Sequence, residues 1–229
     1  MLDPLKEALW FYTAADYLII NAFLWKNTEA MEPCLEIVHG NNIKVIKEAE
    51  EQTPEKRFSF SKLDCRALFD SYRHRTPCDL SSASKRRMLE QAIADIRLLS
   101  RSACTAKQEM LLFRNMEARF KLAGASQGST VDLLGLTSTS ATGQLIDYGQ
   151  KDYRAPAQVL RIHVPIGIPV LCFENAENEV LLPPMSYQVL ASAVRGSIPI
   201  IDLEAQRALD IEKLISAAMD TFSFYFAQG

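Results

Sequence analysis

The chain has 229 residues, 48% of them hydrophobic and 23% charged, which is enough to fold around a core as one large domain or two small ones. This composition excludes a disordered, collagen-like or coiled-coil protein. The formal net charge of −3 provides no basic surface for nucleic acid. The longest apolar window, Tyr17 to Trp25, is shorter than the roughly 20 residues of a membrane helix. We therefore expect no nucleic-acid partner and no membrane insertion.

Cysteine and histidine usage bears on metal and redox chemistry. The five cysteines are odd in number and never form a C-x2-C pair, and the three histidines are scattered. We therefore expect free thiols in a reducing compartment, with neither a disulfide framework nor a bound metal.

Helical periodicity dominates the first part of the chain. Asp3 and Pro4 form an N-cap and first-turn pair that predicts a long opening helix to about Lys26, with a possible break near Thr13. Further helices are expected over 35–52 with a break at Gly40-Asn41-Asn42, over 59–73, and from Ser81 or Ser82 to about residue 100.

After about residue 108, short apolar runs alternate with turn residues, which is typical of strands. Strands are expected over 110–114, 132–138, 157–164, 168–173, 179–182, 187–193 and 198–203, followed by a closing helix over 204–219. Helices that precede strands favour a segregated α+β fold. We expect one domain over 1–229, mainly helical over 1–105 and mainly of strands over 106–229, with the helices packed on the strands.

Three features of the strand region carry polar side chains that could support chemistry. Arg114 ends an apolar run and could offer its guanidinium to a phosphate or carboxylate. The hydroxyl run 137–140 follows a second apolar run. Glu177 and Glu179 lie two apart, so on a strand they face the same side and can hold a cation between them. Taken singly, each feature has an ordinary structural explanation: a paired surface arginine, β-forming threonines, and a solvated loop.

In this order, Arg114, then Ser138-Thr139-Ser140, then Glu177-x-Glu179 resembles the mono-ADP-ribosyltransferases of the Arg-Ser-Glu class. The flanking sequences 136–140 and 179–184 are similar to that family as well. So is the N-terminal pattern of Tyr12, Tyr17 and Ile20-Asn21. The resemblance runs from about residue 10 to about residue 195. It implies helices packed on a two-sheet mixed β core, with NAD as the substrate.

The resemblance also implies a role for each residue of these motifs. Arg114 would hold the NAD pyrophosphate, and Ser138 would brace the catalytic Glu179. Glu179 would accept the ribose 2′-hydroxyl and stabilise the oxocarbenium-like transition state. Glu177 would orient and deprotonate the acceptor, and a glutamate there is similar to the arginine-modifying members. The pair Thr139-Ser140 would shape the nicotinamide pocket.

Two positions depart from the family pattern. Asn115 stands where the family usually has glycine beside the nicotinamide amide, and asparagine tolerates the positive φ that a glycine there could adopt. Leu136 replaces a common aromatic residue, so no stacking is available there. By resemblance, Phe173 would contact the target protein, although packing at a strand end would also explain it. The segment 141–158 would close over the substrate.

The resulting expectation is an enzyme that transfers ADP-ribose from NAD to a protein, most simply to arginine. Asp3 and Glu7 stand where a Sec-type signal carries basic residues, so we expect a bacterial effector or toxin delivered into host cytosol by another route, or an intracellular enzyme. The alternatives are a threonine or other acceptor on a small host protein such as ubiquitin, an NAD glycohydrolase, and an inactive protein-binding module.

Overall fold

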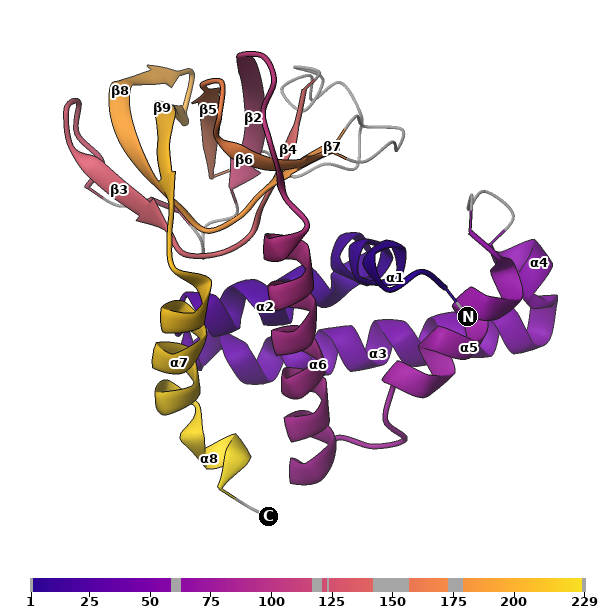
Figure 1. Cartoon of the computed structure of the whole chain (residues 1–229). Helices are drawn as coiled ribbons and strands as arrows, with labels where there is room; N and C mark the ends of the chain where they lie inside the picture. Colours follow the sequence, from indigo (N-terminus) through magenta and orange to yellow (C-terminus); the bar gives the residue numbers. More distant parts are fainter. Residues whose placement is uncertain are drawn as a thin grey trace. The chain divides into compact units, whose positions relative to one another are not determined.

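The computed structural model describes residues 2–58, 63–116, 121–122, 124–141, 157–172 and 179–227. The chain divides into two compact units, a helical unit of Met1–Arg101 with Ile211–Gly229 and a strand unit of Ser102–Asp210 (Figure 1). Helices come first and strands follow, which confirms the predicted α+β class. The last helices of the chain belong to the helical unit.

The opening helix is interrupted where the sequence indicated. α1 spans Pro4–Phe11, a π-helical segment spans Tyr12–Asp16, and α2 spans Tyr17–Leu24. Asp3 caps α1, since its carboxylate accepts from the backbone N of Leu5 and of Lys6, each at 3.1 Å. The predicted break near Thr13 is therefore a change of helix type, and π-helical turns occur frequently at functional sites.

The remaining helices of the helical unit are α3 Thr28–Gln52, α4 Pro54–Arg57, α5 Cys65–Arg75, α6 Ser82–Arg101, α7 Ile211–Thr221 and α8 Ser223–Phe226. The predicted break at Gly40-Asn41-Asn42 is wrong, because α3 runs through it. A single glycine costs a helix about 1 kcal/mol. The buried stripe of α3, which includes Leu35 and Val38, outweighs that cost. Among the described residues, no helix is both long and apolar enough to span a bilayer.

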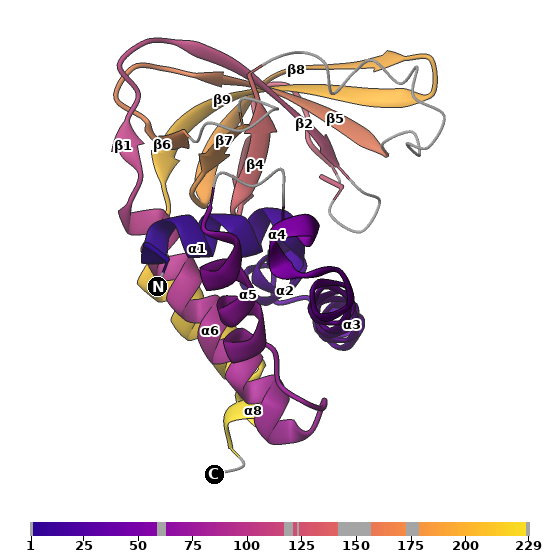
Figure 2. The ribbon, with the colours of Figure 1, turned by 90° about the vertical axis from the view of Figure 1, so that its right-hand side faces the viewer.

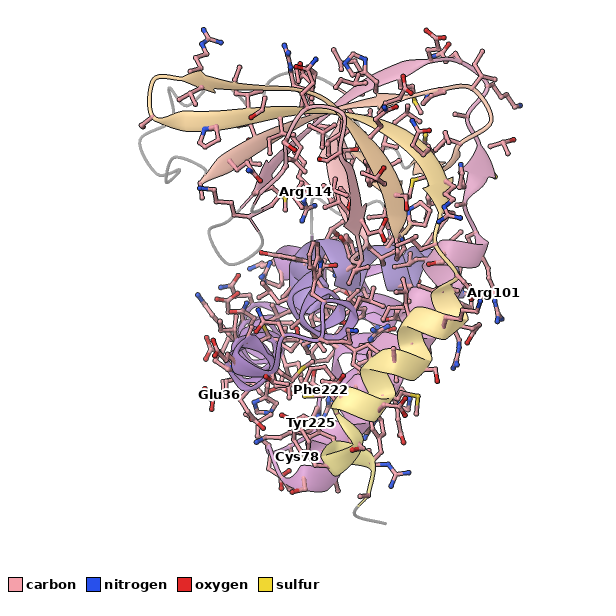
Figure 3. All side chains as sticks on the ribbon, turned by 90° about the vertical axis from the view of Figure 1, so that its left-hand side faces the viewer. Glu36, Cys78, Arg101, Arg114, Phe222 and Tyr225 are labelled. Atoms are coloured by element: carbon pink, nitrogen blue, oxygen red, sulfur yellow. The ribbon has the colours of Figure 1, made fainter. Side chains whose placement is uncertain are left out.

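Aromatic side chains join the C-terminal helices to the rest of the helical unit. Phe222 stacks on Phe23 of α2 with ring centroids 5.7 Å apart, and Tyr225 lies beside Phe222 (Figure 3). On the surface, Glu212 of α7 pairs with Arg97 and Arg101 of α6, each at 2.9 Å. These contacts explain why the chain returns to the helical unit after its last strand.

The strands of the strand unit are β1 Cys104–Thr105, β2 Met110–Met116, β3 Thr130–Leu133, β4 Thr137–Ser140, β5 Gln158–Val164, β6 Pro169–Cys172, β7 Glu179–Leu182, β8 Met185–Arg195 and β9 Ile198–Ala208. Hydrogen bonds join them in the order β1-β6-β7-β4-β2-β5-β9-β8-β3. β5 and β9 are parallel and the other pairs are antiparallel, so the sheet is mixed as expected. β2 and β4 are joined through a single residue pair, Phe113 with Ser140.

Two stretches of the strand unit differ from the expectation. The single strand predicted over 132–138 is two strands, and β3 pairs with β8 whereas β4 lies between β2 and β7. The closing helix predicted over 204–219 begins only at Ile211, because β9 continues to Ala208 along its partner β8 (Figure 2). In β9, Leu203 and Ala205 are buried, and this spacing of two residues is the period of a strand.

Candidate active site

Ser138 and Glu179 lie close together because β4 and β7 are neighbouring strands. In the β4–β7 register, Ser140 is opposite Glu179 and Ser138 is opposite Leu181, so these four residues share one face. The Ser138 hydroxyl donates a hydrogen bond to Oε1 of Glu179. Glu179 is buried, with 7% of its surface exposed. A buried carboxylate held by a hydroxyl is fixed in one orientation, which a catalytic carboxylate requires.

The side chain of Arg114, on β2, extends to Ser138 (Figure 3). Its Nη1 donates to the backbone carbonyl of Ser138 at 2.7 Å, and its Nε lies 3.2 Å from Sδ of Met116. No hydrogen bond joins its Nη2 to a residue of the described ranges. Ser138 is therefore the centre of the group, since its carbonyl holds Arg114 and its hydroxyl holds Glu179.

The neighbouring residues of β4 and β2 have different surroundings. The Thr139 hydroxyl donates to the backbone carbonyl of Val180 at 2.6 Å, and Thr139 is 2% exposed. This hydrogen bond ties β4 to β7 and engages the hydroxyl in the fold. Ser140 is also buried. Asn115 is half-buried on β2, opposite Val159 of β5.

Two residues of the expected site, Phe173 and Glu177, lie outside the described residues, as does most of the segment 141–158. Their roles as acceptor-binding residues and as a covering loop stay predictions. The residues brought together are Arg114, Ser138 and Glu179. They come from three strands adjacent in the sheet order.

Tyr187 of β8 is a buried polar residue beside this group that the sequence analysis gave no role. Its side chain has no exposed surface. Burial raises the pKa of Tyr187, whereas the nearby Arg114 charge and the Thr137 hydroxyl lower it. The electrostatic field of Arg114 thus reaches into the core of the strand unit. The alternation of apolar residues along β8 indicates that Tyr187 is buried. It does not indicate that Arg114, which belongs to a different strand, lies near it.

The chemistry of the group is that of an anion site next to a carboxylate. A guanidinium binds pyrophosphate through charge-assisted hydrogen bonds. A fixed carboxylate stabilises a positive charge that develops in a transition state. Within the described ranges, no three His, Cys, Asp or Glu side chains come together as a metal site.

The sequence matches no protein-family model and no curated protein. Several solved structures are similar to the chain. Vis toxin, an ADP-ribosyltransferase from Vibrio splendidus, is 12% identical over 90% of this chain and 75% of its own, with a TM-score of 0.47. The catalytic domain of VahC from Aeromonas hydrophila is 16% identical over 90% of this chain and 100% of its own, with a TM-score of 0.47.

A third similar structure is Plx2a, an ADP-ribosyltransferase toxin from Paenibacillus larvae, which is 16% identical over 53% of this chain and 72% of its own, with a TM-score of 0.38. These similarities concern the fold. At such identities they do not assign a role to any residue of this chain.

Proposed function

We propose that the protein is an NAD-dependent mono-ADP-ribosyltransferase that modifies a side chain of a target protein. The observation that carries the proposal is the hydrogen-bonded group Arg114, Ser138 and Glu179. These are the three residues that the sequence resemblance relates to the Arg-Ser-Glu class. They are far apart along the chain, and a chance resemblance would give no reason for them to meet.

The group has the chemistry that NAD requires of a binding site. The half-buried Arg114 would pair with the pyrophosphate through the part of its guanidinium that Ser138 leaves unengaged. Glu179 would accept the 2′-hydroxyl of the nicotinamide ribose. Asn115 and Ser140 would line the nicotinamide end. Thr139 would act by fixing the position of β7, because its hydroxyl already donates to Val180.

The reaction breaks the bond between C1′ of the ribose and the nicotinamide nitrogen. The electron pair of that bond leaves with nicotinamide, which is released as a neutral molecule, and positive charge develops at C1′. The carboxylate of Glu179 stabilises this charge in the transition state more than in the ground state, which is the condition for catalysis. An acceptor nitrogen then bonds to C1′ and loses a proton to the carboxylate of Glu177.

Arginine is the acceptor we propose, because a guanidinium would relieve the repulsion between Glu177 and Glu179. Phe173 would contact the target. A threonine acceptor on a small host protein would use the same NAD site. Water would replace the acceptor in an NAD glycohydrolase, and an inactive binding module would cleave no NAD. We further propose a bacterial effector or toxin that acts on a host protein.

Incubation of the full chain with adenylate-labelled NAD and a host-cell lysate separates these functions. The transferase places label on a lysate protein, and mass spectrometry of that protein identifies the modified residue. A glycohydrolase releases free ADP-ribose alone, and an inactive module leaves NAD intact. Either of the last two outcomes would reject the proposal.

The variant Glu177→Gln tests the acceptor role. We expect label transfer to fall by about 100-fold, the scale of a lost general base, whereas NAD hydrolysis is retained. Glu109→Gln is the matched control, because Glu109 is an exposed glutamate of the same unit. Equal loss of transfer and hydrolysis in Glu177→Gln would remove Glu177 from the acceptor role.

A further inference from the structure

Two exposed cysteines lie close together at one edge of the strand unit. Cys104 begins β1 and Cys172 ends β6, and both are free thiols. In the β1–β6 register, Cys104 is opposite Val170. Opposed residues share a face, as do residues two apart on one strand. The two cysteines therefore face the same side of the sheet as diagonal neighbours.

The spacing of diagonal neighbours is near the range that a disulfide requires. Their Cα atoms are typically about 7–8 Å apart, whereas disulfides join Cα atoms about 4.4–6.8 Å apart. The edge strand β1 has two residues and stands at the end of the strand order, so a shift of about 1 Å disturbs few hydrogen bonds. Burial raises the pKa of Cys172, and the neighbouring Cys104 raises it further.

We propose that Cys104 and Cys172 form a redox pair, a dithiol that glutathione disulfide oxidises to an intramolecular disulfide between β1 and β6. The thiolate of Cys104 attacks one sulfur of glutathione disulfide, which forms a mixed disulfide and releases one glutathione thiolate. Cys172 then loses its proton and attacks the Cys104 sulfur. The S–S bond between the cysteines forms and the second glutathione leaves, so two thiols of the protein are oxidised and one glutathione disulfide is reduced.

Cys104 is the attacking thiol because burial and its neighbour keep the Cys172 thiol protonated to a higher pH. Cys172 acts second, when the Cys104 sulfur is already bound to glutathione and carries no charge.

The position of the pair relates it to the candidate active site. Cys172 is opposite Val180 of β7, the residue after Glu179. Since alternate residues of a strand face opposite sides, the Cys172 thiol and the Glu179 carboxylate lie on different faces. The disulfide would thus fix the position of β6, which pairs with β7, without covering the Glu179 carboxylate.

The test is oxidation of the folded full chain with glutathione disulfide, followed by alkylation, intact mass measurement and peptide mapping. We expect a product that has lost two hydrogens and a linked peptide pair that contains Cys104 and Cys172. Cys78→Ser should give the same link, because Cys78 is an exposed cysteine of the helical unit. Cys104→Ser should instead carry one glutathione on Cys172.

Two results would overturn the proposal. In one, Cys104 and Cys172 stay unlinked, whether reduced or each bound to glutathione, while Cys78 reacts. In the other, disulfides of Cys78 with Cys104 or Cys172 form as readily as the proposed disulfide. Such random pairing is what the chain unfolded in urea is expected to give. Neither readout depends on NAD, so the redox pair and the proposed enzyme activity can fail independently.

Discussion

Ser138 is the residue on which the geometry of the candidate site depends. It holds Arg114 through its backbone carbonyl and Glu179 through its side chain. A substitution of the side chain therefore releases the carboxylate but leaves the arginine in place. This separation allows the two contributions to be measured apart.

We expect Ser138→Ala to lower the rate of nicotinamide release about tenfold, which corresponds to about 1.4 kcal/mol, the scale of one hydrogen bond. KM for NAD should change little, because Arg114 keeps its contact with the Ser138 carbonyl. Steady-state kinetics of NAD cleavage would measure both constants. Ser138→Thr keeps a hydroxyl and should recover part of the rate, and Ser192→Ala is a control on an exposed serine of β8. A tenfold rise in KM with an unchanged kcat would contradict the positioning role.

The sequence selects Arg114, Ser138 and Glu179 because their order resembles a known family, and the structure joins them by hydrogen bonds. The sequence was not sufficient for Tyr187. Strand alternation shows that this tyrosine is buried, but not that Arg114 lies nearby. Such contacts depend on which strands meet in space, and that information is absent from local patterns.

The π-helical segment between α1 and α2 ends at a buried cluster of charges in the helical unit. Asp16, its last residue, lies 3.0 Å from Nη2 of Arg75, which also pairs with the buried Asp95. Burial raises the pKa of Asp16 to about 7, Arg75 opposes this rise, and Asp95 adds to it. One guanidinium thus faces more than one carboxylate, and a proton on Asp16 reduces the excess negative charge.

This pKa makes the stability of the helical unit depend on pH. The folded form of Asp16 binds its proton more tightly than the unfolded form, whose pKa is 3.8, so its contribution to stability is lost as pH rises from about 4 to about 7. Between pH 5 and pH 8, the wild type should therefore lose about 3 kcal/mol relative to Asp16→Asn, as measured by urea unfolding. Asp70→Asn, at an exposed position of α5, should follow the wild type. Parallel curves for the wild type and Asp16→Asn would refute the titration of Asp16.

Helix α3 offers a test of why the predicted break at Gly40 does not occur. A Cβ at Gly40 would meet no atom within 4 Å, and the residue is helical and exposed. Gly40→Ala should therefore stabilise the protein by about 1 kcal/mol, read as a higher urea midpoint. Gly196 has equally open surroundings but a φ of 63°, so Gly196→Ala should destabilise it. If Gly40→Ala lowered the midpoint, the local backbone of α3 would not be an ordinary helix.

At the scale of elements, periodicity was most reliable where buried residues recur at a regular spacing, as in α6. It failed for the strand predicted over 132–138, because an apolar run does not reveal that its two ends pair with different strands. It also missed β1, whose two exposed residues carry no burial pattern. Which strands pair with each other determines where these strands begin and end. That pairing exists only in the assembled sheet.

At the scale of the whole molecule, the order of helices before strands was enough to predict an α+β protein. The return of the chain from β9 to the helical unit was not predictable, since the contact of Phe222 with Phe23 joins opposite ends of the sequence. The net charge of −3 excluded bulk electrostatic binding, but the proposed chemistry depends on single charges inside the strand unit.

The central claim is that Glu179 drives the cleavage of NAD. Its most direct test is the rate of nicotinamide release from NAD by the wild type, Glu179→Gln and the surface control Glu109→Gln. We expect a loss of about 100-fold or more in kcat for Glu179→Gln, with retained NAD binding and an unchanged control. A Glu179→Gln variant that cleaved NAD at the wild-type rate would show that Glu179 does not drive the cleavage.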